Sequence, residues 1–163
     1  MKKSLMIVAL VAGFSAMVIG ADEKHAVGGE MGPGIVKGDA IKWGAQPPGL
    51  PAGMQMAVLL GDPGKEGPYV LRSKMPDGYK VPPHWHSADE NLTILSGTLL
   101  VGHGEKLERA TMTELGAGSF CHMPKGMHHY VMAKGETVIQ VHGIGPFDIT
   151  YINPADDPRK EKK

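Results

Sequence analysis

The most informative stretch of the 163-residue sequence reads Pro82-Pro83-His84-Trp85-His86-Ser87-Ala88-Asp89-Glu90. Side chains alternate across a β-strand, so His84 and His86 point to the same face, with Trp85 on the other. Two imidazoles on one face of a rigid strand share a cation with little ordering cost. This stretch therefore predicts a strand that presents a pair of metal-binding side chains.

Glu90 begins the apolar run that follows, and Leu92 and Ile94 share its parity along that strand. A carboxylate that points with them enters an apolar interior. Burial without a partner is costly for a carboxylate, and a metal ion would offset that cost. We therefore expect Glu90 to join the two histidines.

A second cluster reads Met123-Pro124-Lys125-Gly126-Met127-His128-His129-Tyr130. The Pro-x-Gly sequence makes a tight turn, and an imidazole then opens the next strand. His128 and His129 are competing candidates, because neighbours on a strand face opposite ways and one ion would not take both.

Composition narrows the class of protein. The 17 basic and 17 acidic side chains balance, which disfavours a nucleic-acid or anionic-membrane partner recognised by bulk charge. The 23 glycines and 13 prolines beside 42% hydrophobic residues suit one turn-rich all-β domain. A single cysteine excludes an internal disulfide, a cysteine-rich zinc module and CxxC redox chemistry.

The first residues have the layout of a bacterial secretory signal peptide. Lys2 and Lys3 precede an apolar run over Leu5–Ile19, and small residues then lead into polar sequence. We expect residues 1–20 to be this signal, with cleavage after Gly20 or Ala21. The expectation is a periplasmic or secreted protein that has no membrane segment once the signal is removed.

The mature chain divides into three parts. Residues 21–53 form an irregular arm rich in glycine and proline, residues 54–153 a β-barrel, and residues 154–163 a charged tail that frays. We expect almost no helix beyond the signal. The barrel strands are predicted at Met54–Leu60, Tyr69–Ser73, Tyr79–His86, Glu90–Ser96, Thr98–Gly102, Ala110–Leu115, Ser119–Met123, His129–Ala133, Thr137–His142 and Phe147–Ile152.

The spacing of nine residues resembles the two signature motifs of the cupin superfamily. The first motif reads Gly-x5-His-x-His-x3-Glu-x6-Gly and comprises Gly78, His84, His86, Glu90 and Gly97. The second reads Gly-x5-Pro-x-Gly-x2-His and comprises Gly118, Pro124, Gly126 and His129. One position departs from the pattern, since Ala133 stands where an Asn is usual.

The resemblance implies a double-stranded β-helix, or jelly-roll, barrel that forms a homodimer and holds one divalent transition metal ion. The ion would be Fe, Mn, Ni, Cu or Zn, because the donor set has no thiolate. The motif selects His129 over His128 and implies the ligands His84, His86, Glu90 and His129. The chain is also similar to small single-domain exported bacterial cupins of the type-2 and ChrR-like kinds.

The resemblance further implies a metal-dependent enzyme that acts on a small-molecule substrate. Four protein ligands leave one or two positions open on the ion. We favour a dioxygenase, with isomerase or decarboxylase chemistry as alternatives and with Glu90 as a proton acceptor if it detaches. The competing hypothesis is a non-catalytic cupin that binds or senses a metabolite or a metal ion.

Other polar residues have two interpretations each. Three residues either orient a metal ligand through hydrogen bonds or lie on the solvent side: His122, and His142 together with Gln140. Arg72 meets a substrate carboxylate if its strand turns it inward. Cys121 is expected to be a buried filler, and His103 to lie exposed at a hairpin tip.

Overall fold

A computed structural model describes residues 34–160 of the chain. The predicted signal peptide and the first part of the arm lie outside the described residues. Within residues 34–160, no helix is long and apolar enough to cross a membrane. Helical structure there consists of three short 3-10 turns, η1 (Gly38–Ala40), η2 (Arg109–Thr111) and η3 (Pro154–Asp156).

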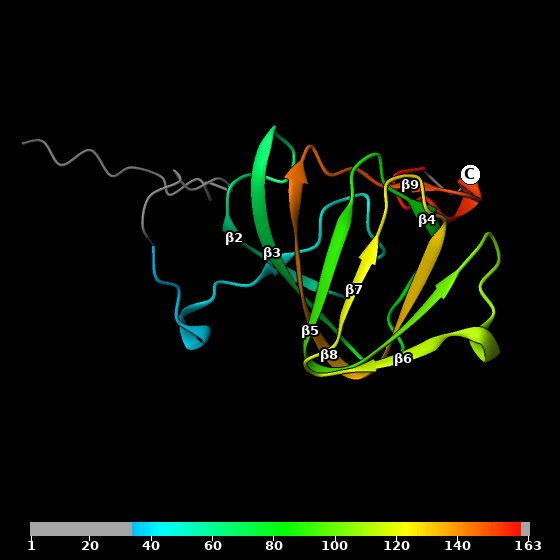
Figure 1. The fold of residues 1–163 in the computed structure, drawn as a ribbon, viewed down its shortest axis with the longest axis horizontal. Coiled ribbons are helices and arrows are strands. Elements are labelled where there is room, and N and C mark those ends of the chain that lie inside the picture. The colour runs from blue at the N-terminus through cyan, green and yellow to red at the C-terminus, as the bar shows by residue number, and fades with distance from the viewer. Residues whose placement is uncertain (1–33, 161–163) are drawn as a thin grey trace, which may run out of the picture.

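The described chain is built of antiparallel strands, as predicted for the all-β class. In Figure 1 the strands curl around a common interior. They are β1 (Gly44–Ala45), β2 (Gln55–Leu60), β3 (Gly67–Met75), β4 (Lys80–Trp85), β5 (Glu90–His103), β6 (Thr113–Gly116), β7 (Phe120–Met123), β8 (His129–Gly145) and β9 (Thr150–Tyr151).

Two long strands, β5 and β8, hold the fold together. They pair with each other from Asn91 opposite His142 to His103 opposite His129. One half of β8 also pairs with β3, and the other half pairs with β4. Likewise, β7 pairs with the first half of β5 and β6 with its second half. The two long strands therefore run through both faces of the barrel.

Both long strands bend at a glycine. Gly97 in β5 has φ +76° and Gly135 in β8 has φ +74°, conformations that L-residues with side chains avoid. Thr137, which is fully buried, bridges the bend: its hydroxyl donates to the carbonyl of Thr98 at 2.9 Å and accepts from the amide of Thr98 at 3.2 Å. The bends let each strand turn from one face to the other without ending.

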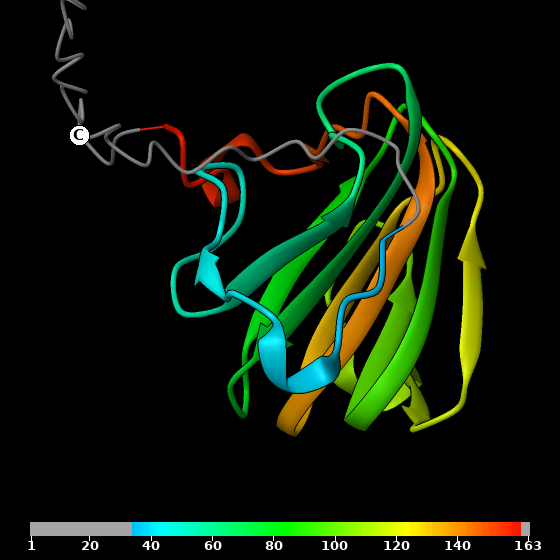
Figure 2. The same ribbon diagram turned by 90° about the vertical axis from the view of Figure 1, so that its left-hand side faces the viewer.

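The segments before and after the barrel pack against it. The phenol of Tyr79 donates to the carbonyl of Pro51 at 2.7 Å, and that of Tyr151 donates to the carbonyl of Gly49 at 2.9 Å. In Figure 2 the cyan arm lies beside the red C-terminal segment. The arm includes β1, which pairs with β2, so residues 34–53 are less irregular than predicted.

Four strand predictions are corrected by the bends. The runs predicted separately at 90–96 and 98–102 are one strand, β5, and those at 129–133 and 137–142 are one strand, β8. The strand predicted over Phe147–Ile152 shrinks to β9, because residues 147–149 leave the ladder and contact the interior. Within the predicted tail, Nη2 of Arg159 donates to the carbonyl of Ile149 at 3.1 Å.

Gly97→Ala should destabilise the fold strongly. A Cβ at this position would overlap the carbonyl oxygen of Glu136 and lie 2.7 Å from the hydroxyl of Thr137, in addition to the backbone strain. We expect a loss of about 3 kcal/mol in the free energy of unfolding, measured by urea denaturation. Gly118→Ala is the matched control: its φ is +86° but it has open space around it, and we expect a loss of about 1 kcal/mol. Equal losses would contradict the close packing at the bend.

Candidate metal centre

The end of β4 brings two histidines to the interior: His84 lies in the strand, and His86 follows directly after its last residue, Trp85. His84 is 3% exposed and His86 is 5% exposed, whereas Trp85 between them is only half-buried. This is the alternation that the sequence predicted. His129 opens β8, is 1% exposed and lies opposite His84 in the register between β4 and β8.

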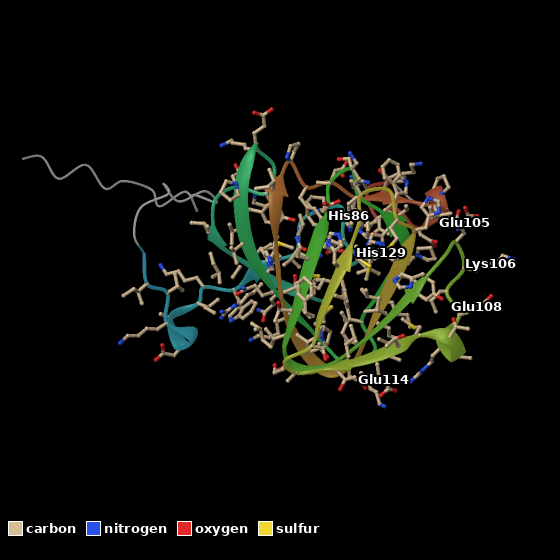
Figure 3. The ribbon with its side chains drawn as sticks, in the orientation of Figure 1. His86, Glu105, Lys106, Glu108, Glu114 and His129 are labelled. Atoms are coloured by element: carbon tan, nitrogen blue, oxygen red, sulfur yellow. The ribbon has the colours of Figure 1, made fainter. Side chains whose placement is uncertain are left out.

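The three imidazoles converge. One ring nitrogen of each of His84, His86 and His129 lies within 4.8 Å of the others. The ring centroids of His84 and His129 are 4.2 Å apart. Figure 3 labels His86 and His129 close together within the barrel, and their ring centroids are 5.2 Å apart. Three histidines at this separation could hold one metal ion.

Backbone carbonyls determine which nitrogen of each ring faces the centre. The Nδ1 of His84 lies 2.7 Å from the carbonyl of Pro82, and that of His129 lies 3.0 Å from the carbonyl of Met127. The Nδ1 of His86 contacts the carbonyl of Asp148. A carbonyl only accepts, so each Nδ1 carries the proton and donates. In a neutral ring the lone pair is then on Nε2, the form that binds a metal.

Glu90 completes the cluster as the first residue of β5. Its Oε2 lies 3.2 Å from Nε2 of His129 and 3.5 Å from Nε2 of His86. Both Nε2 atoms are buried and make no well-directed hydrogen bond. Lone pairs on an oxygen and a nitrogen at this distance repel, so the arrangement calls for a proton or a cation between them. The cluster fits a divalent ion with three nitrogen ligands and one oxygen ligand.

The pKa values of the metal-free cluster follow from burial and from the neighbouring charges. Burial and the adjacent imidazoles of His129 and His86 lower the pKa of His84 to about 3. Burial alone would lower the pKa of His86, but the Glu90 carboxylate raises it above its ordinary value. Burial likewise opposes the charge on Glu90, but His129 and His86 hold its pKa below the ordinary value.

A cavity of about 350 Å³ opens beside the cluster. Its walls are mainly apolar side chains from β2, β3, β5 and β8, including Met56, Leu71, Leu92, Ile139 and Val141. Cavities of this size bury a small organic ligand. The cluster and the cavity together can present a metal-bound molecule to an apolar, largely dry environment.

The structure decides between the two adjacent histidines of the second motif. His129 points into the cluster, whereas His128 points outward and its Nδ1 lies 3.3 Å from a carboxylate oxygen of Glu105. Figure 3 shows Glu105 at the edge of the molecule, away from His86 and His129. The four residues that the cupin motifs indicated are therefore brought together, and His128 is not among them.

The remaining sequence candidates lie away from the cluster. Arg72 donates to the side chain of Gln140 at 3.1 Å, and neither residue lines the cavity. The sequence predicts that Arg72 meets a substrate carboxylate only if its strand turns it inward. That condition is not met, because even-numbered residues of β3 face away from the interior. Gln140 does not orient a ligand either, since its amide oxygen is engaged by Arg72.

His122 and His142 flank Asn91 on the outer face of the sheet. His122 contacts the Asn91 side chain at 3.1 Å, and the carbonyl of His142 accepts from the same side chain at 3.1 Å. His122 is exposed and takes the solvent-side interpretation, whereas His142 is half-buried on the same outer face and its Nδ1 is buried without a hydrogen-bond partner. His103 is exposed at the end of β5, as predicted.

Cys121 packs against the core, and burial raises the pKa of its thiol to about 11. A thiol with a raised pKa is a poor nucleophile, in agreement with the predicted filler role.

Sequence reasoning missed three residues that build the site. Phe147 stacks on His86 with ring centroids 4.3 Å apart, and Asp148 accepts from the amide of Ser87 at 2.8 Å. Arg159 lines the cavity from the C-terminal segment and is held by Asp157 through two hydrogen bonds of 2.8 and 2.9 Å. No local pattern marks these residues, because their role arises only when the segment folds back over β4.

Comparison with known proteins places the fold. The model of the family described as "Domain of unknown function (DUF4437)" matches residues 35–158. This match runs beyond the predicted barrel of residues 54–153 and takes in the segments on both sides. No curated protein sequence matches the chain.

Solved structures match over most of the chain at low identity. The polyketide cyclase RemF from Streptomyces resistomycificus has a TM-score of 0.60 and 17% identity, over 78% of this chain and 90% of that one. A protein proposed to be an acetylacetone dioxygenase, from Methylibium petroleiphilum PM1, has a TM-score of 0.60 and 16% identity, over 80% and 88%. An RmlC-like cupin from Shewanella frigidimarina NCIMB 400 has a TM-score of 0.53 and 13% identity, over 71% and 92%. These likenesses show the fold, and the predicted cupin fold is confirmed.

Acidification below about pH 6.5 should destabilise the metal-free protein. The unfolded chain protonates His84 near its ordinary pKa of 6.5, whereas the folded chain does so only near 3. Between these values the unfolded state binds one more proton, so the free energy of unfolding falls as the pH falls, by up to about 1.4 kcal/mol per pH unit. Urea titrations of chelator-treated protein from pH 7 downward measure this slope.

The other two groups act in different pH windows. Because the folded chain lowers the pKa of Glu90, the free energy of unfolding falls further as the pH drops below 4.5, the ordinary pKa of this carboxyl. The raised pKa of His86 contributes stability that is present below 6.5 and is lost as the pH rises above it. The slope between pH 6.5 and 4.5 therefore isolates His84, and His84→Gln should flatten it. An equally steep slope in the variant would contradict the burial of a neutral imidazole at this position.

Proposed function

The chain belongs to the family described as a domain of unknown function (DUF4437), and from this premise we propose that it is a metal-dependent cupin that acts on a small organic molecule. One divalent transition metal ion would be held by His84, His86, His129 and Glu90. The cavity beside these residues would receive the molecule. Its apolar walls would exclude water from the reacting groups.

The observation that carries the proposal is that all three imidazoles have the same tautomer, with the proton on Nδ1. Each imidazole donates through Nδ1 to a backbone carbonyl, and the Nε2 atoms of His86 and His129 lie 3.5 and 3.2 Å from Oε2 of Glu90. A core that only needed filling would have apolar side chains here, because a buried carboxylate among three imidazoles is unfavourable without a cation. The ligand set is held in place before any ion arrives, which favours tight binding.

A metal ion in this site would polarise a bound oxygen atom or activate dioxygen, depending on its identity. The chain's own residues would supply position and shielding. His84, His86 and His129 would hold the ion, and the cavity walls would orient the organic molecule. Glu90 is better suited to holding the ion than to accepting a proton, because a carboxylate with a lowered pKa is a weak base.

We favour a dioxygenase among the possible reactions. The donor set has no thiolate and leaves positions open on the ion, and the cavity is lined by apolar groups that dioxygen and an organic molecule enter readily. Isomerase and decarboxylase reactions need a separate proton-transfer group. Among residues 34–160, Asp148 is the one carboxylate of the cavity lining outside the cluster, and its Oδ1 already accepts from the amide of Ser87 at 2.8 Å.

His84→Ala should weaken metal binding by more than about 100-fold, because it removes one of four ligands; the loss of an outer hydrogen-bonding partner alone costs about 10- to 100-fold. Zn²⁺ and Co²⁺ titrations against a competing chelator measure the affinity, with protein purified without nickel resin. His128→Ala is the matched control, since His128 pairs with Glu105 at the surface, and we expect less than about a threefold change. The reverse ranking would overturn the ligand assignment.

Protein reconstituted with Fe²⁺ or Mn²⁺ should consume dioxygen with at least one member of a panel of catechols, flavonols, diketones and hydroxy-acids. An oxygen electrode measures the rate, and His84→Ala should abolish it. Tight binding of a panel member without turnover under any of the five metals would instead support the non-catalytic cupin that binds or senses a metabolite.

A further inference from the structure

One hydroxyl on the cavity wall has no partner in the protein. Ser73 lies in β3 between Leu71 and Met75, which share its parity, and all three are buried and line the cavity. Ser73 is only 4% exposed. Its hydroxyl makes no hydrogen bond with any residue from 34 to 160, although the neighbouring Arg72 bonds to Gln140 on the other face.

The other polar side chains of the cavity lining are already engaged. The three histidines use Nδ1 for backbone carbonyls and turn Nε2 to the cluster. Asp148 accepts from Ser87, and Arg159 is paired with Asp157. Ser73 is the one uncharged polar side chain of the described lining outside the cluster, and no residue from 34 to 160 bonds to its hydroxyl.

A buried hydroxyl without a partner is unfavourable for folding. Valine or alanine would suit this strand position between Leu71 and Met75 better, because the surrounding wall is apolar. The Ser73 hydroxyl oxygen is not among the fully buried polar atoms without a partner, so it opens onto the cavity. A ligand that covers it without a hydrogen bond leaves it buried and unpaired, at a cost to binding, and a ligand that bonds to it avoids that cost.

The charge of the lining indicates the class of that ligand. Arg159 is its only permanently cationic side chain within residues 34–160, and the two hydrogen bonds to Asp157 neutralise it. An anionic group on the ligand, away from the metal, would find no free counter-charge in the cavity. The walls therefore favour an uncharged organic body.

We propose that Ser73 is a specificity-determining residue of the cavity: it hydrogen-bonds an oxygen atom of an uncharged, largely apolar ligand, separate from the oxygen that binds the metal. This inference rests on the proposed function, since the metal cluster anchors the other end of the ligand. A site that hydrogen-bonds a hydroxyl group discriminates against analogues that lack it.

The first test is the stability of the ligand-free protein. Ser73→Ala removes an unpaired polar group, so we expect an unchanged or higher midpoint of thermal unfolding. Ser96→Ala, at an exposed position of β5, is the control for the serine-to-alanine change in a strand. A fall of more than about 3 °C in Ser73→Ala relative to this control would show that the hydroxyl supports the fold, and it would overturn the proposal.

The second test uses 2,3-dihydroxynaphthalene as the probe, with its 5-hydroxy, 6-hydroxy and 6-carboxylate derivatives. Binding to Zn²⁺-loaded protein is measured by calorimetry, since zinc supports no oxidation of these probes. We expect at least one hydroxy derivative to bind about 2- to 10-fold more tightly than the parent, as one hydrogen bond provides. Ser73→Ala should remove that preference and leave the affinity for the parent within about twofold.

The outcomes separate this inference from the proposed function. A hydroxyl preference that persists in Ser73→Ala, the absence of any preference in the unaltered protein, or stronger binding of the carboxylate would each overturn the role of Ser73. Zn²⁺ affinity is measured on the same samples. Loss of Zn²⁺ binding in the unaltered protein would overturn the metal site itself.

Discussion

The arrangement at the centre of the barrel depends on three backbone carbonyl groups. Each accepts a hydrogen bond from the Nδ1 of one histidine, and the carbonyls come from Pro82, Met127 and Asp148 in three separate segments. Because the acceptors are main-chain atoms, the ring orientations are set by the path of the backbone. The folded barrel therefore sets the orientation of each ring and the tautomer of its neutral form.

The cavity beside the cluster is likewise formed by several separate segments of the chain. The strands supply its apolar walls, while the segment before β2 and the segment after β9 close part of it through Gly49, Leu50, Ile149 and Arg159. Tyr151 ties these two segments together by donating to Gly49. The family match to residues 35–158 covers both segments, so the functional unit is larger than the strands alone. Apart from the cluster, Asp148 and Arg159, the described lining is uncharged.

Several parts of this arrangement were predictable from local sequence. The alternation of His84, Trp85 and His86 on a strand, and the position of Glu90 at the start of the next one, placed three of the four residues on the correct face. The spacing of the second motif selected His129 over His128. Strand boundaries were less predictable at Gly97, because a glycine that bends a strand and a glycine that ends one look alike in sequence.

What the sequence by itself determined is local: the periodicity of the strands, the turns at glycine and proline, and the type and spacing of the donor residues. These depend on interactions between near neighbours, so they can be read in order along the chain. Tertiary structure alone decided that Phe147 and Asp148 brace His86, that Arg159 reaches the cavity, and that Arg72 faces away from it. The reason is that the contacts of His86 with Asp148 and of Arg72 with Gln140 join residues 62 and 68 positions apart, and such contacts form only where the closed barrel brings the segments together.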